Sequence, residues 1–316
     1  MSNSAIAASG LRKAYGDKIV LDGIDLDVPA GTVFSLLGPN GAGKTTTVNV
    51  LTTLAKADGG TVRVAGHDVA TEAKAVRAAV GVTGQFAAVD ELLTGQENLQ
   101  LMADLKHVGA REGSRVVTGL LERFDLAESA QKLVSAYSGG MRRKLDLAMT
   151  LVGNPRIIFL DEPTTGLDPR SRRTMWDIVR ELVADGVTIF LTTQYLEEAD
   201  QLADRIAVLD HGRIVAYGAP GELKRQLPGS HVRLRFADAA ELDAAAQVLT
   251  GSTRDDEDLT LRVPSDGGVK SLRALLGQLD EHSINPEEFS VHTPDLDDVF
   301  LALTGHQARR RSHNEQ

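Results

Sequence analysis

A glycine-rich segment near the N-terminus has the residue types needed to bind phosphate. The segment GPNGAGKT (residues 38–45) fits the pattern G-x-x-x-x-G-K-[ST], follows a short apolar stretch and opens a helical pattern. The glycines let backbone N–H groups curl around phosphate oxygens, and the helix start adds a favourable dipole. A glycine-rich turn would match the four fixed positions by chance only about once in several tens of thousands of sites. The residues that we assign to nucleotide binding here are Gly38, Pro39, Asn40, Gly41, Ala42, Gly43, Lys44, Thr45 and Thr46.

Individual side chains of this loop have distinct expected roles. Lys44 should reach the β- and γ-phosphates, and the hydroxyl of Thr45 should bind Mg²⁺. Two adjacent carboxylates end the apolar segment IIFLDEP, where neighbouring side chains point in different directions. We expect Asp161 to serve the metal and Glu162 to act as the general base toward the attacking water, although two solvated acids at a strand end are common by themselves. Gln85 follows another apolar segment and can offer its carbonyl oxygen to Mg²⁺ or water, but a polar residue at a strand end is ordinary.

A second anion site is predicted at YSGGM, residues 137–141. Ser138, Gly139 and Gly140 open a helical pattern whose apolar stripe is Met141, Leu145, Ala148 and Leu151. An N-cap alone would account for Ser138 but not for two glycines, because glycine costs about 1 kcal/mol relative to alanine inside a helix. One nucleotide needs only one phosphate loop. We therefore expect each segment to supply half a site, so that two chains face head to tail with ATP between them.

The elements that must position these residues form an α/β domain. Short apolar strands at 32–37, 79–84, 156–161, 187–192 and 205–210 alternate with helical patterns, which is typical of a parallel sheet covered by helices. Residues 6–28 instead favour an antiparallel β-layer, and residues 87–153 an inserted helical subdomain.

The pattern of predicted strands and helices changes after residue 226. We expect an ATP-binding domain at 1–226, a small α+β domain at 227–305 and a disordered tail at 306–316. In the small domain, strands are predicted at 231–236, 259–263 and 288–292, around helices at 239–249 and 268–279. The basic cluster Arg309–Arg311 is interpreted as part of a solvated tail, with a contact to anionic lipid or a partner as the alternative.

Composition excludes several function classes. The 316-residue chain is 42% hydrophobic, enough for substantial cores, and its net charge of −10 argues against wholesale nucleic-acid binding. It has no cysteine, hence no disulfide, thiolate metal site or thiol nucleophile. No segment approaches the roughly 18 consecutive apolar residues of a membrane span, and the N-terminus lacks a signal pattern. We therefore expect a chain that is soluble by itself.

These motifs together resemble those of ATP-binding-cassette (ABC) transporter nucleotide-binding subunits. GPNGAGKT, Gln85, YSGGM, IIFLDE and GLD (residues 166–168) occur in the order of that family, over about the first 220 residues. The resemblance implies a phosphate-loop NTPase fold and adds two site residues. Tyr15 is similar to the aromatic residue that stacks on adenine, although a half-buried strand tyrosine would look the same. Asp168 is similar to a residue at the dimer seam, although it could simply cap the helix that starts near Pro169.

A narrower resemblance covers almost the whole chain. YSGGMRRKLDLA, LTTQYLEEADQLADRIAVLDHG and LDDVFLALTG resemble the daunorubicin/doxorubicin-resistance type of ATP-binding protein. The last motif is also readable as an amphipathic helix with Leu296, Val299, Phe300 and Leu303 packed into the small domain. Two positions depart from the general cassette pattern: Met141 replaces a glutamine and Gln194 a histidine. Both are familiar within the subgroup, where Gln194 is expected to contact the γ-phosphate.

The resemblance implies an ATPase subunit, with ATP and Mg²⁺, that drives export of an amphipathic drug or lipid. Glu162, Gln194, Lys44 and Gln85 are then the catalytic residues, and Thr45, Gln85 and Asp161 the metal ligands. It also implies a homodimer and a separate membrane permease at the cytoplasmic face of the membrane. The alternatives are a non-transport cassette protein acting on ribosomes or DNA, and a drug-sequestering protein that uses ATP as a switch. The sequence has neither the second cassette nor the long coiled coils of the former.

Overall fold

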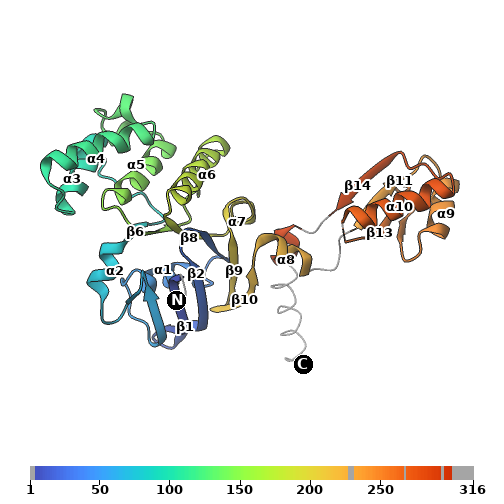
Figure 1. Cartoon of the computed structure of the whole chain (residues 1–316), viewed down its shortest axis with the longest axis horizontal. Helices are drawn as coiled ribbons and strands as arrows, with labels where there is room; N and C mark the ends of the chain where they lie inside the picture. The colour runs from blue at the N-terminus through green and yellow to red at the C-terminus, as the bar shows by residue number, and fades with distance from the viewer. Residues whose placement is uncertain (1–3, 227–230, 267, 293–294, 301–316) are drawn as a thin grey trace. The chain divides into compact units, whose positions relative to one another are not determined.

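Two compact units make up the chain, residues 1–220 and 221–316. The computed structural model describes residues 4–226, 231–266, 268–292 and 295–300, which are coloured in Figure 1. The sequence led us to expect the boundary after residue 226, whereas the division by contacts falls at the start of helix α8 (Pro220–Gln226). Within the described residues, no helix is both long and apolar enough to cross a membrane.

A six-stranded sheet forms the centre of the first unit, in the order β10-β9-β3-β8-β7-β6. The pairs are parallel except for β9 with β10. Five strands confirm those expected from the sequence to within one residue at each end, and β10 is additional. The strands are β3 (Val33–Leu37), β6 (Val80–Thr83), β7 (Ile157–Asp161), β8 (Thr188–Thr193), β9 (Arg205–Asp210) and β10 (Arg213–Gly218).

An antiparallel layer packs on one face of this sheet, as the alternating N-terminal residues predicted. Strands β1 and β2 form a hairpin around Gly16, but β4 and β5, from beyond the phosphate loop, widen the layer to four strands. Phe34, Phe159 and Phe190 point into the core between the layers, with ring centroids 5.3–5.4 Å apart. The layer consists of β1 (Ser4–Tyr15), β2 (Lys18–Pro29), β4 (Gly59–Val64) and β5 (His67–Asp68).

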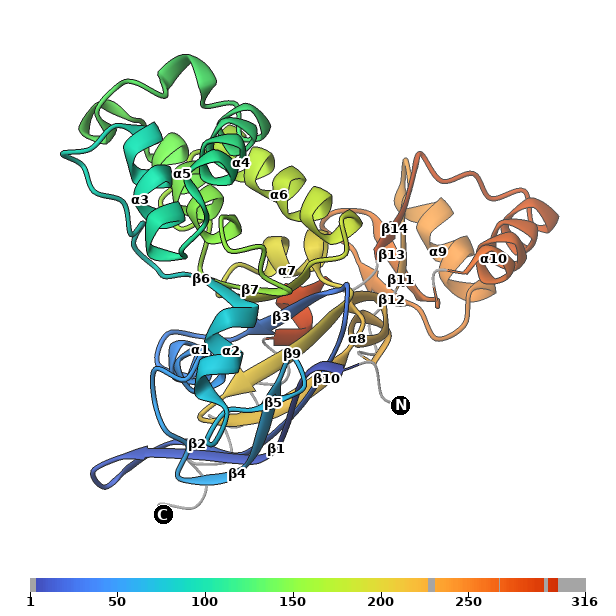
Figure 2. The ribbon, with the colours of Figure 1, turned by 60° about the vertical axis from the view of Figure 1, so that its left-hand side comes forward.

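Helices cover the opposite face, where the alternate residues of the same strands form a second core with them. Figures 1 and 2 both show α3, α4 and α5 gathered on the side away from the antiparallel layer, in the region expected to be a helical subdomain. A capping box of Thr94 and Glu97 starts α3, and Asp168 followed by Pro169 starts α6. The helices on this side are α3 (Gly95–Leu105), α4 (Ala110–Arg123), α5 (Gly139–Leu151), α6 (Pro169–Ala184) and α7 (Leu196–Leu202), with 3₁₀ turns at Ala127–Ser129 and Val134–Ala136. Helices α1 (Lys44–Leu51) and α2 (Ala73–Ala79) instead pack into the core shared with the antiparallel layer.

The second unit contains a four-stranded antiparallel sheet in the order β12-β13-β11-β14. Two helices, α9 (Ala239–Val248) and α10 (Val269–Glu281), share its core with inward residues such as Leu234 and Leu261. The strands are β11 (His231–Arg235), β12 (Thr253–Asp255), β13 (Thr260–Pro264) and β14 (Glu288–His292), of which only β12 was not expected. Leu296 and Val299 are buried and Phe300 is half-buried, while Leu303, Arg309–Arg311 and the expected tail lie outside the described residues.

Candidate functional site

The loop between β3 and α1 depends on its glycines for its shape. Gly41 and Gly43 have φ angles of +81° and +117°, in the region that L-residues with side chains avoid. A Cβ atom at Gly43 would also lie 2.6 Å from Leu21 Cδ2, and one at Gly38 would collide with the carbonyl oxygen of Leu209. The loop can therefore pack against β2 and β9 only without these side chains, and it leads directly into the N-terminus of α1.

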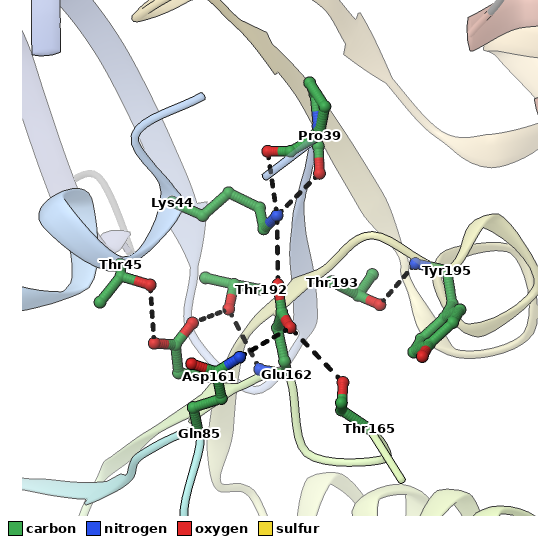
Figure 3. A network of polar contacts seen from close by, with 11 residues as sticks. Pro39, Lys44, Thr45, Gln85, Asp161, Glu162, Thr165, Thr192, Thr193 and Tyr195 are labelled. Atoms are coloured by element: carbon green, nitrogen blue, oxygen red, sulfur yellow. Dashed lines mark hydrogen bonds and ion pairs between the residues drawn. The ribbon is translucent and has the colours of Figure 1, made fainter. Parts of the chain in front are cut away.

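Lys44 is the first residue of α1, and its side chain turns back under the loop. Its Nζ donates hydrogen bonds to the carbonyl oxygens of Gly38, at 2.7 Å, and Pro39, at 3.2 Å. The same Nζ lies 3.2 Å from Oε1 of Glu162, and both side chains are more than nine-tenths buried. The ammonium is thus held between the loop backbone and a carboxylate, as Figure 3 shows.

Asp161 ends β7 between two threonines. Thr45 Oγ1 donates to its Oδ2 at 3.0 Å, and the hydroxyl of Thr192 in β8 donates to its Oδ1. In the described part of the chain, no three His, Cys, Asp or Glu residues form a complete metal-binding group. Magnesium instead usually binds one or two protein oxygens together with substrate phosphates and water. The exposed Thr45 hydroxyl beside the Asp161 carboxylate fits that donor set.

Glu162 has an unusual backbone conformation at the start of the segment after β7. Its φ is +50°, a left-handed geometry that is uncommon for residues other than glycine. Its amide donates to the carbonyl oxygen of Thr192 at 3.0 Å, which ties it to β8. Oε2 faces Thr165 Oγ1 at 3.4 Å and Gln85 Nε2 at 3.5 Å. The structure therefore brings Lys44, Gln85 and Glu162 together from three separate segments (Figure 3).

The segment Ser138–Gly140 occupies the N-terminus of α5. Ser138 caps the helix, since its Oγ accepts from the amide of Met141 at 3.2 Å. A Cβ at Gly140 would lie 2.7 Å from Ser171 Oγ, so this glycine lets α5 approach α6 closely. Gly139 is exposed, with Leu167 Cδ2 3.9 Å from its ideal Cβ position. The apolar stripe from Met141 to Leu151 packs into the core as expected.

The remaining candidates lie at the ends of elements. Tyr15 ends β1, is half-exposed and has the ammonium of Lys13 5.1 Å from its ring centroid. Gln194 is partly buried between β8 and α7. Asp168 caps α6 by accepting from the amides of Arg170 and Ser171, and hydrogen bonds from Ser171 hold the pKa of its carboxyl below the ordinary value. Helix capping accounts for these contacts of Asp168, and its role at a dimer seam stays a prediction.

Sequence reasoning missed several residues that shape the site. Thr192 binds both Asp161 and Glu162, and Arg143 and Asp146 of α5 bind the backbone around Gln85 and Glu162. The only signal was the occurrence of charged residues on the buried side of a helix and of threonine at a buried strand end. Neither pattern indicates which residue the side chain will bind, because its hydrogen-bond partner lies 18 or more positions away in the sequence.

Comparisons with known proteins agree with this architecture. Residues 21–165 match the model of the ABC transporter family. The chain is 51% identical to the daunorubicin resistance ATP-binding protein DrrA3 of Streptomyces coeruleorubidus, with 98% of both chains covered. It is 49% identical to the daunorubicin/doxorubicin resistance ATP-binding protein DrrA of Streptomyces peucetius, covering 98% of this chain and 96% of that one. It is 37% identical to the Nod factor export ATP-binding protein I of Ralstonia nicotianae, covering 98% of this chain and 96% of that one.

Solved structures match about 70% of the chain. The ATP-binding subunit of an ABC transporter superposes with a TM-score of 0.64 at 27% identity, covering 71% of this chain and 93% of that chain. An ATP-binding cassette solved as a dimer in a post-hydrolysis state with ADP and Pi gives a TM-score of 0.62 at 25% identity, over 68% and 98%. The relatives match this chain over nearly its whole length, and the solved structures share its fold. The chain therefore belongs to the ATP-binding proteins of ABC transporters, in the group of the daunorubicin and doxorubicin resistance proteins.

Proposed function

We propose that this ABC ATPase hydrolyses Mg-ATP to energise a separate membrane permease that exports an amphipathic drug or lipid. The proposed hydrolysis is supported by one observation: residues of the phosphate loop and of the end of β7 meet at one site. These residues are Lys44, Thr45, Asp161 and Glu162. The export part is supported by relatives that are named for drug resistance and for Nod factor export.

Each residue has a separate task in this proposal. The backbone amides of the loop and the Lys44 ammonium bind the β- and γ-phosphates, whose negative charge develops further during transfer. Thr45, Asp161 and Gln85 would hold Mg²⁺, which neutralises charge on the phosphate oxygens when bound. Glu162 orients the attacking water and accepts its proton, and Gln85, 3.5 Å from that carboxylate, helps to hold it in place. Gln194 contacts the γ-phosphate, and Tyr15 stacks on the adenine.

A homodimer completes the proposed site. Ser138 and Gly139 are exposed at the N-terminus of α5, where backbone donors and the helix dipole favour an anion. Ser138 accepts hydrogen bonds from the amides of Met141 and Arg142, and Leu167 lies beside Gly139, so these contacts are all outside the phosphate loop. We infer that they contact the γ-phosphate held by the loop of a second chain, and that Asp168 lies at the same seam. A similar cassette that was solved as a dimer supports this assembly.

The permease would hold the chain at the cytoplasmic face of the membrane. The second unit contains none of the proposed phosphate-contacting residues, and we assign to it assembly with the permease or with the second chain. Ending the chain after Gly229 should leave ATP binding intact and weaken coupling. Loss of ATP binding in such a truncation, if it is otherwise folded, would contradict this division.

The decisive test is reconstitution with a candidate membrane permease. Inside-out vesicles that contain both proteins should accumulate daunorubicin only with Mg-ATP, and vesicles with the Lys44→Ala chain should not. Co-purification with ribosomes or DNA, or drug binding by the isolated chain without transport, would replace this proposal by one of its rivals.

A further inference from the structure

An ion pair lies inside the first unit on α5, and none of the proposed steps uses it. Arg143 Nη1 is 3.2 Å from Asp146 Oδ2, one helical turn along, and the two side chains are 7% and 4% exposed. Burial lowers the pKa of the Arg143 guanidinium and raises that of the Asp146 carboxyl, because both lose water. A buried pair of this kind persists only if further hydrogen bonds satisfy its remaining donors and acceptors.

The other donors of Arg143 contact backbone on both sides of two proposed site residues. Nη1 donates to the carbonyl oxygen of Gly84 at 2.7 Å, directly before Gln85. Nε donates to the carbonyl oxygen of Pro163 at 2.9 Å, and Nη2 to that of Asp161 at 3.4 Å. These two carbonyl groups flank Glu162. One planar guanidinium thus spans the segment of Gln85 and the segment of Glu162.

Asp146 holds the far end of the Gln85 segment. Its Oδ1 accepts from the amide of Ala88 at 3.0 Å. The segment 84–88 is therefore fixed to α5 at its first and last residues. Between these two anchors lie Gln85, Phe86 and Ala87, and Phe86 is 85% exposed.

We infer that Arg143 and Asp146 are positioning residues that fix the Gln85 segment relative to Glu162, so that both reach the attacking water in one arrangement. This inference rests on the proposed roles of Gln85 and Glu162. The backbone of Glu162 is left-handed, with φ +50°. Such an uncommon conformation persists only where the surrounding structure holds it, and the hydrogen bonds of Arg143 to the neighbouring carbonyl groups provide that support. The contact between Gln85 Nε2 and Glu162 Oε2 is long, at 3.5 Å, so their separation is set by backbone anchors more than by that contact.

Replacing Arg143 by lysine tests the geometry without removing the charge. A lysine ammonium is compact and lacks the planar fork, so it cannot reach Gly84, Asp161 and Pro163 at once. Arg143→Lys should lower kcat by about 10- to 100-fold and leave the Kd for Mg-ATP within about twofold. The matched control is Arg180→Lys, because Arg180 pairs with Asp177 on the exposed face of α6 at 2.9 Å, also three residues apart. The control should keep wild-type kcat and Kd.

A double-mutant cycle separates positioning from a general loss of stability. Gln85→Ala should lower kcat in the wild-type chain but should change it less than about twofold in the Arg143→Lys chain, where Gln85 is no longer held. Equal fold-losses in both backgrounds mean that Arg143 and Gln85 act independently, and they overturn the inference.

A second variant guards against simple misfolding. The double substitution Arg143→Met/Asp146→Leu removes both charges together, so that neither is left buried without its partner. The carbonyl oxygens of Gly84 and Pro163 and the amide of Ala88 lose their partners, so the melting temperature should fall, but the variant should still unfold cooperatively and show the loss of kcat. Wild-type kcat in this variant overturns the inference. Glu162→Gln, measured in parallel, keeps the two hypotheses apart: if it turns over ATP like the wild type, the proposed base is wrong, whereas normal turnover in Arg143→Lys alone defeats the positioning role.

Discussion

The Lys44 ammonium lies 3.2 Å from a carboxylate oxygen of Glu162, so the proposed phosphate-binding cation and the proposed base are in direct contact inside the protein. In such a buried location each charge stabilises the other, and removal of one leaves the other without compensation. A substitution at either position therefore acts on both.

Lys44→Ala should abolish productive nucleotide binding or turnover. The phosphate loop loses its cation, and the buried Glu162 carboxylate is left without this partner. Steady-state phosphate release and binding of a fluorescent ATP analogue measure the two effects, with circular dichroism as the control for folding. Undiminished ATPase activity would remove the phosphate-loop assignment.

Glu162→Gln should retain ATP binding and lose hydrolysis, because an amide can hydrogen-bond water but cannot accept its proton. A general base typically contributes 10²- to 10⁴-fold, or about 3–5 kcal/mol of barrier. The variant should accumulate as an ATP-bound dimer, which light scattering with Mg-ATP detects. A strictly monomeric and fully active variant contradicts both the base and the composite site.

Mixing a Lys44→Ala chain with a Gly139→Asp chain should restore one of the two composite sites in each heterodimer. The aspartate should repel the γ-phosphate, yet the space around Gly139 is open enough that the fold should tolerate it. Gly139→Ala is the control for size without charge and should keep wild-type stability. The mixture could turn over ATP no faster than its components, either because the two sites of a dimer work only together or because no site is shared between chains. Nucleotide-dependent crosslinking between the two chains then distinguishes these explanations.

Gln194→Ala should lower hydrolysis substantially, and Gln194→His should preserve it. Glutamine can donate and accept hydrogen bonds but does not titrate, whereas a histidine would change charge near pH 6.5. Only the histidine variant should therefore acquire a new pH dependence near neutrality. The measurement is a pH–rate profile of the three proteins at saturating Mg-ATP, and an alanine variant as fast as the wild type excludes a phosphate contact.

Glu198→Gln should stabilise the fold more at pH 8 than at pH 5. Burial raises the pKa of the Glu198 carboxyl above its ordinary value, although hydrogen bonds from Thr193, Thr164 and Trp176 oppose the shift. A raised pKa means that the fold favours the protonated form, so wild-type stability is present below the ordinary pKa and is lost as the pH rises through the raised one. Glutamine has no such loss. Melting temperatures at the two pH values test this, and an equal difference at both contradicts it.

Local sequence patterns sufficed for much of the fold. The apolar runs of β3, β7 and β8 are buried on both faces, which makes them continuous and easy to recognise. By contrast, β4 and β10 are only partly buried and carry weaker patterns, and their membership in a sheet depends on partners far away in the chain. The predicted domain boundary after residue 226 and the division into compact units at residue 220 differ by the single helix α8, whose sequence has no local signal that assigns it to either unit.

The site could be anticipated in its residue types more than in its contacts. The glycines, Lys44 and Thr45 are fixed by a local loop, and their spacing shows in the sequence. The hydrogen bonds of Thr192 and Arg143 join segments that meet only in the folded sheet. Nor does any local pattern show that Glu162 has a left-handed backbone, since glutamate is not a residue that favours it.

The position of β3 in the middle of the sheet has a consequence for how the protein is made. Val33 pairs with Ile189 in β8, and Leu37 with Val208 in β9, so the strand that carries the phosphate loop finds its neighbours late in synthesis. Because translation proceeds from the N-terminus, the loop cannot be held in shape until β9 has left the ribosome. A nascent chain that stops before β9 would leave one edge of β3 unpaired, and an unpaired strand edge can pair with other chains and promote aggregation.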